Sequence, residues 1–181
     1  MKIINLYAGP GVGKSVRAAE IFSELKKNNF ECELITEYAK DLLYEQRINI
    51  IESDQLFILA QQHRRIGRLL DKNVEFLITD SPLLLSSVYN NPKNLNQDIF
   101  DKLVMELYNK YENYDFLLER NLEYKYSPTG RFQTSVDDAI ILDVAIKEKL
   151  DYLNINYISI ENDRHTVNYI IDYILRKKLE G

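Results

Sequence analysis

The chain has 181 residues, of which 45% are hydrophobic and 28% charged, so it can bury one substantial core and is not a disordered protein. A net charge of −5 and a pI near 5.2 make nucleic acid an unlikely partner in general, although a local basic cleft stays open as an alternative. The single cysteine, Cys32, excludes an internal disulfide, and without a signal peptide or a long apolar run we expect one soluble, cytoplasmic domain over residues 1–181 with no membrane partner.

Apolar runs alternate with helix-length amphipathic segments along the chain. We expect strands at Ile3–Tyr7, Cys32–Thr36, Val74–Thr79, Phe116–Leu118 and Tyr157–Ile160. We expect helices at Lys14–Lys27, Tyr38–Gln46, Ser53–Leu70, Asn96–Tyr111, Ser135–Leu153 and Asp163–Lys178. This alternation predicts a three-layer α/β domain, in which helices cover both faces of a five-stranded parallel sheet. Functional loops then gather at the carboxyl ends of the strands.

A glycine-rich segment, Ala8–Ser15, follows the first strand directly. It matches the phosphate-binding pattern G-x-x-x-x-G-K-[ST], with Ala8 at a first position that needs only a small residue. Its glycines let successive N–H groups point at one anion, Lys14 can reach the β- and γ-phosphates, and the Ser15 hydroxyl can bind Mg²⁺. The pattern therefore predicts an ATP site. Its residues are Gly9, Pro10, Gly11, Val12, Gly13, Lys14, Ser15 and Val16.

Two acids stand at predicted strand ends. Asp80 ends an apolar strand, which is the Walker B arrangement for holding Mg²⁺; the alternative is a helix cap before Pro82. Glu37 follows another strand, where a substrate would lie, and could take the proton of an attacking hydroxyl. The alternative for Glu37 is a glutamate in the first turn of a helix, where it complements the dipole.

Arginines provide the cations that phosphoryl transfer needs. The polar segment 121–134 is long enough for a lid or a binding loop; Arg120 precedes it and Arg131 lies within it. Planar guanidinium groups suit phosphoryl oxygens, whereas an exposed, solvated arginine is the alternative for each.

A second polar group lies on the helix predicted over Ser53–Leu70. For this group we favour a solvated face over contact with a base or a phosphate. Its members are Gln61, Gln62, Arg64, Arg65 and Arg68. The two histidines, His63 and His165, have no partner at metal-ligand spacing, so neither is assigned to a metal or to catalysis.

Four segments together resemble a known family. They are Ala8–Ser15, Glu37–Lys40, Thr79–Leu83 and Gly130–Gln133. In order and spacing over almost the whole chain, they resemble the small P-loop kinases and ATPases related to the ribosylnicotinamide kinase domain of bacterial NAD-biosynthesis regulators, a group with many phage-encoded relatives. The chain is also similar to deoxynucleoside kinases, in which a glutamate at the place of Glu37 acts as base. It departs from their acidic-Arg-Ser motif, because Ser81 and Pro82 follow Asp80.

The resemblance implies a P-loop NTPase fold with a lid, and a kinase that moves the γ-phosphate of ATP to a hydroxyl group. Lys14 would hold the β- and γ-phosphates, Ser15 and Asp80 would hold Mg²⁺, and Glu37 would orient the acceptor hydroxyl. A phage-encoded relative would work in the host cytoplasm.

The resemblance further implies that Arg120 and Arg131 close over the γ-phosphoryl group. The acceptor would be a nucleoside-like small molecule. The alternatives are a kinase of a nucleotide or of a modified DNA base, and an ATPase or nucleotide switch that acts on a partner. A switch would predict a glutamate beside Asp80, where Ser81 stands. The oligomeric state stays open, with a homodimer as one option.

Overall fold

The computed structural model describes residues 1–122, 126–127 and 135–180. In this part of the chain the strands are β1 (Lys2–Tyr7), β2 (Cys32–Ile35), β3 (Phe76–Thr79), β4 (Glu112–Glu119) and β5 (Tyr157–Glu161). The helices are α1 (Lys14–Lys27), α2 (Tyr38–Tyr44), α3 (Ile48–Ser53), α4 (Gln55–Gly67), α5 (Leu85–Tyr89), α6 (Gln97–Tyr108), α7 (Val136–Tyr152) and α8 (Thr166–Glu180). No helix in these ranges is long and apolar enough to cross a membrane.

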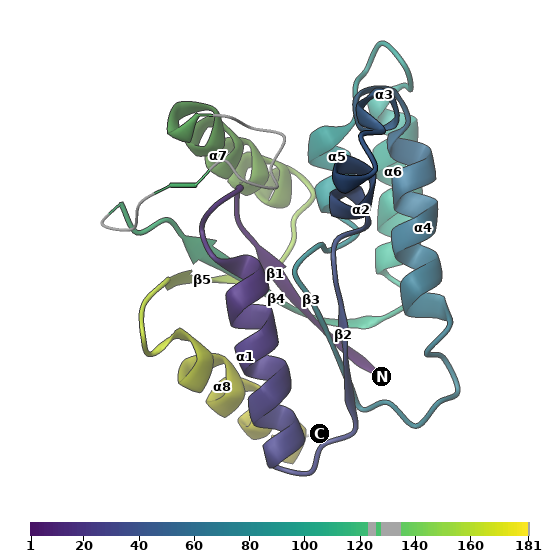
Figure 1. Ribbon diagram of the computed structural model, residues 1–181. Helices are drawn as coiled ribbons and strands as arrows, with labels where there is room; N and C mark the ends of the chain where they lie inside the picture. Colours follow the sequence, from purple (N-terminus) through teal and green to yellow (C-terminus); the bar gives the residue numbers. More distant parts are fainter. Residues whose placement is uncertain (123–125, 128–134, 181) are drawn as a thin grey trace.

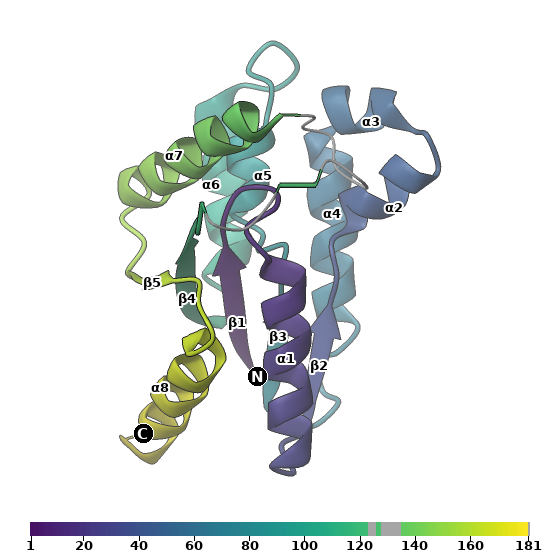
Figure 2. The same cartoon turned by 60° about the vertical axis from the view of Figure 1, so that its left-hand side comes forward.

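The strands form one five-stranded sheet in the order β2-β3-β1-β4-β5, and every neighbouring pair is parallel. The α/β class and the parallel sheet predicted from the sequence are thus confirmed. In this order β1 is central, with β3 on one side and β4 on the other. Because all strands run the same way, their carboxyl ends lie along one edge, where the loop after β1 rises between α7 and α2 (Figures 1 and 2).

Alternate residues of each strand enter two separate cores. Ile4 and Leu6 face one core, which α1 and α8 cover with residues such as Ile21 and Ile170. Ile3, Tyr7 and Leu77 face the other core, which is closed by residues of α4, α6 and α7. This period of two places helices on both faces of the sheet, as the three-layer prediction requires (Figure 1).

Strand β4 begins at Glu112, several residues before the predicted Phe116. Its first half is polar, so the prediction missed the start of the strand. The preceding helix, predicted to end at Tyr111, ends at Tyr108. Asp115, which is 5% exposed, accepts hydrogen bonds from Asn5 Nδ2 at 3.0 Å and Tyr7 Oη at 2.9 Å in β1. Because these side chains pair with one another inside the sheet, a polar stretch can form a central strand.

The two short helices α3 and α5 were also not predicted from the sequence. Each has only five or six residues, too few to show a clear helical period. Helix α5 matters for the site because it follows directly on the Asp80 segment and carries Tyr89 toward it.

Candidate active site

The carboxyl ends of all five strands contribute to one site. The predicted phosphate-binding loop, Ala8–Ser15, follows β1 and is called the phosphate loop below. Glu37 follows β2 by two residues, and Asp80 follows β3 directly. Arg120 follows β4 and Asn162 follows β5. Loops that are distant in the sequence are therefore brought together by the topology of the sheet.

The phosphate loop has the backbone conformation that its glycines permit. Gly11 and Gly13 have φ angles of 82° and 111°, in the left-handed region that other residues rarely adopt. Lys14 starts α1, and its Nζ donates to the carbonyl oxygens of Ala8 at 2.6 Å and Gly9 at 3.1 Å. The ammonium group thus lies across the first turn of the loop.

The other predicted loop residues lie along the same turn. The Pro10 carbonyl accepts a hydrogen bond from Arg120, and Val12 is buried in the core beneath the loop. Ser15 and Val16 form the first turn of α1 and are exposed, with the Val16 side chain directed away from the core. Ser15 therefore stands where a phosphate-bound cation could reach its hydroxyl.

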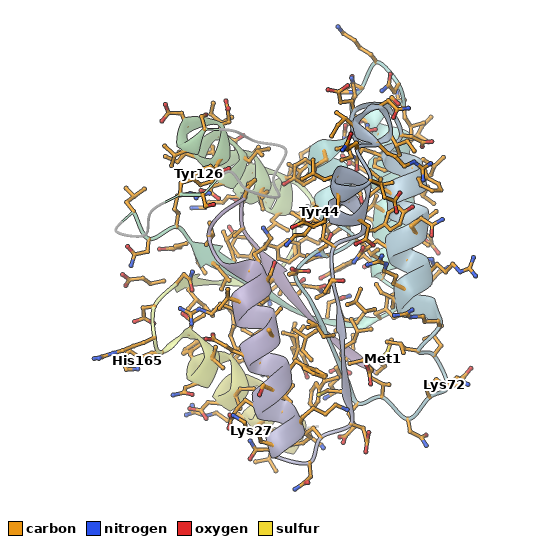
Figure 3. All side chains as sticks on the ribbon, in the orientation of Figure 1. Met1, Lys27, Tyr44, Lys72, Tyr126 and His165 are labelled. Atoms are coloured by element: carbon orange, nitrogen blue, oxygen red, sulfur yellow. The ribbon has the colours of Figure 1, made fainter. Side chains whose placement is uncertain are left out.

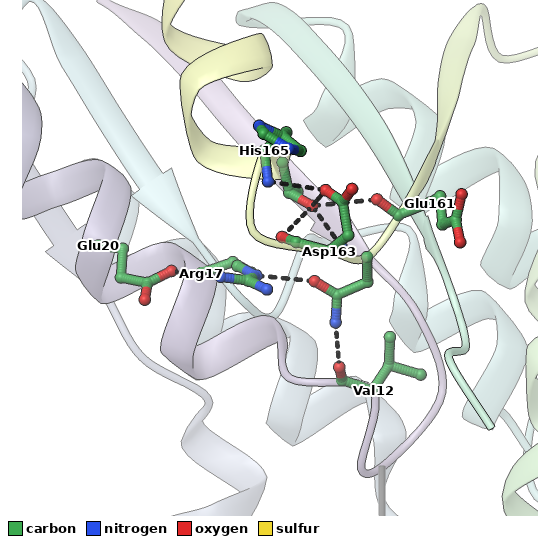
Figure 4. Close-up of polar contacts among 8 residues, drawn as sticks. Val12, Arg17, Glu20, Glu161, Asp163 and His165 are labelled. Atoms are coloured by element: carbon green, nitrogen blue, oxygen red, sulfur yellow. Dashed lines mark hydrogen bonds and ion pairs between the residues drawn. The ribbon is translucent and has the colours of Figure 1, made fainter. Parts of the chain in front are cut away.

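A buried amide holds the loop from the side of β5. Asn162, which is 2% exposed, donates from Nδ2 to the carbonyl of Val12 at 2.5 Å and accepts from Arg17 Nε at 2.7 Å (Figure 4). Thr166 caps the same turn: its hydroxyl accepts from the Asp163 amide at 2.9 Å. The turn after β5 therefore contacts the phosphate loop through Asn162.

The two predicted acids lie near Lys14. Asp80 is 4% exposed, and its Oδ1 has no hydrogen-bond partner among the described residues. Burial raises the pKa of Glu37; the charge of Asp80 raises it further and that of Lys14 opposes both effects. Burial lowers the pKa of Lys14, against the charges of Glu37, Asp80 and Asp143. These mutual effects show one compact cluster of charges.

Arg120 does not extend into solvent. Its side chain is 10% exposed and forms an ion pair with Asp143 of α7, with Nε 2.5 Å from Oδ2. Its NH2 group donates to the Pro10 carbonyl at 2.8 Å. The guanidinium group thus lies on the phosphate loop, so the solvated alternative for Arg120 is wrong.

Two solved structures share this arrangement of strands and helices. A structure of NadR protein in complex with NR has a TM-score of 0.69 at 14% sequence identity, over 95% of this chain and 51% of that chain. The chain thus spans about half the length of that NadR chain. A deoxyadenosine kinase from M. mycoides, with dCMP and a flexible dCDP bound as products, has a TM-score of 0.56 at 19% identity over 100% of both chains.

The fold is that of the P-loop kinases. No protein-family model matches the chain, and no curated protein matches its sequence. The loop after β1 and the acids after β2 and β3 lie at the carboxyl ends of three neighbouring parallel strands.

The polar group on α4 has a role that the sequence did not reveal. Gln62, which is 3% exposed, accepts from the Tyr38 amide at 3.1 Å and donates to the Thr36 carbonyl at 3.3 Å. Arg65 donates to the same carbonyl at 3.0 Å and pairs with Asp41. The solvated-face interpretation is wrong for these two residues, because Gln62 bonds to the backbone on both sides of Glu37 and Arg65 bonds to the Thr36 carbonyl before it.

Part of the predicted lid lies outside the described residues, including Arg131 with Gly130, Phe132 and Gln133. Tyr126, labelled in Figure 3, is one of the residues of this segment that the structure describes. Its ring lies on the loop: two of its carbons are 2.6 Å from the position that a Cβ on Gly11 would take. Residues before α7 therefore reach the phosphate loop.

Tyr89 is another residue of the site that sequence reasoning missed. Burial raises its pKa well above the ordinary value, and the charges of Glu37 and Asp143 add to the effect. Its phenol therefore lies close to both carboxylates. No sequence signal pointed to Tyr89, because the short helix that carries it was not predicted.

Neither histidine belongs to the site. Nε2 of His63 lies 3.1 Å from the Tyr111 hydroxyl, and His165 lies beside Arg164 on the exposed turn before α8. Among the described residues, no three His, Cys, Asp or Glu side chains form a group that could hold a metal ion.

Proposed function

We propose that the protein is an ATP-dependent kinase that transfers the γ-phosphoryl group to a hydroxyl of a nucleoside-like small molecule. The observation that carries the proposal is the charge cluster of Lys14, Glu37 and Asp80 at the phosphate loop. It joins a phosphate-binding cation, a candidate base and a candidate metal ligand in one place. The compounds in the two similar structures, NR, dCMP and dCDP, support a nucleoside-like acceptor.

The donor half of the site is formed by the loop and α1. Its backbone N–H groups and the positive end of the α1 dipole favour the β- and γ-phosphates of ATP. Lys14 would leave the carbonyls of Ala8 and Gly9 to contact the phosphate oxygens, which are stronger acceptors because they are charged.

The residues present fit a Mg²⁺ ion bound with ATP. Asp80 offers a buried carboxylate oxygen with no partner among the described residues, and Ser15 offers a hydroxyl on the first turn of α1. Mg²⁺ commonly takes only one or two protein oxygens, and phosphates and water complete its shell. When bound, the ion would neutralise charge on the β- and γ-phosphates.

Glu37 is the proposed general base. Its carboxylate accepts the proton of the acceptor hydroxyl while that oxygen bonds to the γ-phosphorus and the bond to the β,γ-bridging oxygen breaks, releasing ADP. Burial raises the pKa of Glu37 above its ordinary value, which improves a carboxylate as a proton acceptor. Gln62 and Arg65 keep the Glu37 backbone in place.

The arginines are proposed to stabilise charge on the transferring group. Arg120 already lies on the loop through Pro10, and Arg131 would approach from the lid. The competing function is an ATPase or nucleotide switch. Ser81, which stands next to Asp80 in place of a water-activating glutamate, favours transfer over hydrolysis.

One screen tests the proposal. ATP consumption is measured with nucleosides, nucleotides, ribosylnicotinamide and hydroxymethylated DNA as acceptors, and phosphorylated products are identified by mass spectrometry. We expect a phosphorylated nucleoside-like product with wild-type protein and a loss of about 10²-fold or more in Glu37→Gln. ATP hydrolysis that is independent of every acceptor, or full activity of Glu37→Gln, would contradict the proposal.

A further inference from the structure

A single carboxylate on α7 joins two parts of the phosphate site. Oδ1 of Asp143 accepts a hydrogen bond from the Gly9 amide at 2.7 Å. Oδ2 accepts from Arg120 Nε at 2.5 Å, and Oδ1 also lies 3.2 Å from Arg120 NH2. The loop after β1 and the arginine after β4 are therefore held by one side chain from a third element.

The contact between Gly9 and α7 leaves no space for a side chain at position 9. A Cβ on Gly9 would lie 2.3 Å from Asp143 Oδ1 and 2.8 Å from the Ala139 carbonyl oxygen. Only glycine lets the loop approach the helix this closely. The sequence pattern explained Gly9 by the curl of the loop, whereas the structure adds a direct contact with Asp143.

The same carboxylate sets the orientation of Arg120. With Nε on Asp143 and NH2 on the Pro10 carbonyl, the plane of the guanidinium group is fixed. Its NH1 atom then lies 3.6 Å from the position of a Cβ on Gly11. Arg120 thus presents one edge to the middle of the phosphate loop. Because the bidentate contact with Asp143 already orders the long Arg120 side chain, that side chain loses less conformational entropy when it binds a phosphate.

We propose that Asp143 is a positioning residue of the donor site: it fixes the first turn of the phosphate loop and aims Arg120 at that loop. This inference rests on the proposed function in one respect, namely that the loop binds the phosphates of ATP.

Two variants separate the two contacts of Asp143. Asp143→Asn is isosteric and keeps an oxygen for the Gly9 amide but loses the charge that pairs with Arg120, whereas Asp143→Ala loses both. Glu148→Gln is the matched control, because it removes an exposed carboxylate from the same helix. Each protein is titrated with MgATP and MgADP by calorimetry, its amide spectrum is recorded by NMR, and its unfolding free energy is measured.

We expect MgATP affinity to fall about tenfold or more in Asp143→Ala, less in Asp143→Asn and not at all in Glu148→Gln. The Gly9 amide resonance should move strongly in Asp143→Ala and little in Asp143→Asn. A folded Asp143→Ala protein that binds MgATP within twofold of wild type, or whose Gly9 resonance is unchanged, overturns the inference. Wild-type protein that binds MgATP but phosphorylates no acceptor overturns the proposed kinase function alone.

Discussion

Gln62 offers the sharpest test of how the candidate base is held. In Gln62→Leu the side chain keeps its approximate size but loses its hydrogen bonds to the Tyr38 amide and the Thr36 carbonyl. The Thr36 carbonyl keeps a second donor, Arg65 NH1 at 3.0 Å, so the loss of its hydrogen bond from Gln62 costs about 1 kcal/mol. The Tyr38 amide is left without its acceptor, which costs about 1–2 kcal/mol more.

We therefore expect the free energy of unfolding to fall by about 2–3 kcal/mol, as measured by urea denaturation. Glu37 lies between Thr36 and Tyr38, which both lose their hydrogen bond to Gln62, so kcat should also fall, by about tenfold, while MgATP affinity stays close to wild type. This split between catalysis and donor binding is what a positioning role predicts and a general loss of stability does not.

Gln61→Leu is the matched control, because the Gln61 side chain lies one residue away and makes no hydrogen bond among the described residues. Both variants exchange an amide for the same apolar side chain on the same helix. If Gln62→Leu were no less stable than Gln61→Leu, or if its kcat equalled that of wild type, the proposed support of Glu37 by α4 would be wrong.

Four further predictions concern the charge cluster and the loop. Because burial raises the pKa of Glu37, the acid-side decrease of kcat/KM should occur at a pH above the range of an ordinary glutamate. Glu37→Gln should abolish this decrease. A decrease within the ordinary range of glutamate would contradict the role of Glu37 as base. The same raised pKa means that the native state binds this proton more tightly than the unfolded chain, so the unfolding free energy should decline as pH rises through that interval. Asp80→Asn should weaken the Mg²⁺ dependence of activity and lower kcat by about 10²-fold. It should not lower the unfolding free energy, since Oδ1 has no hydrogen-bond partner among the described residues. An unchanged Mg²⁺ titration would show that Asp80 is not a ligand. Asn162→Ala should lower the unfolding free energy by about 2 kcal/mol through loss of its bonds to Val12 and Arg17, whereas Arg164→Ala on the same exposed turn should not.

The fold could be predicted because its signals are local. Apolar strands, amphipathic helices and the glycine pattern of Ala8–Ser15 each lie within a few consecutive residues. Right-handed crossovers then bring the loops that follow the strands to one edge of the sheet. Strand β4 shows where this fails. Asn113 and Asp115 look like loop residues until their partners in β1 are known, and those partners lie more than 100 residues away.

The residues of the candidate site also differ in whether a local sequence pattern predicts them. Lys14, Glu37 and Asp80 were predicted because each stands in a recognisable place relative to a strand. Gln62 and Asp143 were not, because each acts on a backbone group of a distant segment: Gln62 on Tyr38, and Asp143 on Gly9. A side chain that holds a main-chain N–H or C=O leaves no pattern in the sequence of either partner.

The same distinction explains how the site is built. The loop after β1 is held from one side by Asn162 and from the other by Asp143, while Gln62 holds the segment after β2. Each of these three side chains bonds to main-chain atoms and comes from a different element. A site for phosphoryl transfer works mainly by placing groups correctly, so rigid support of the loops would add to the effect of the charges that they carry. Loss of any one support should therefore move a catalytic group without removing it, and lower kcat or phosphate affinity at an intact set of charged residues.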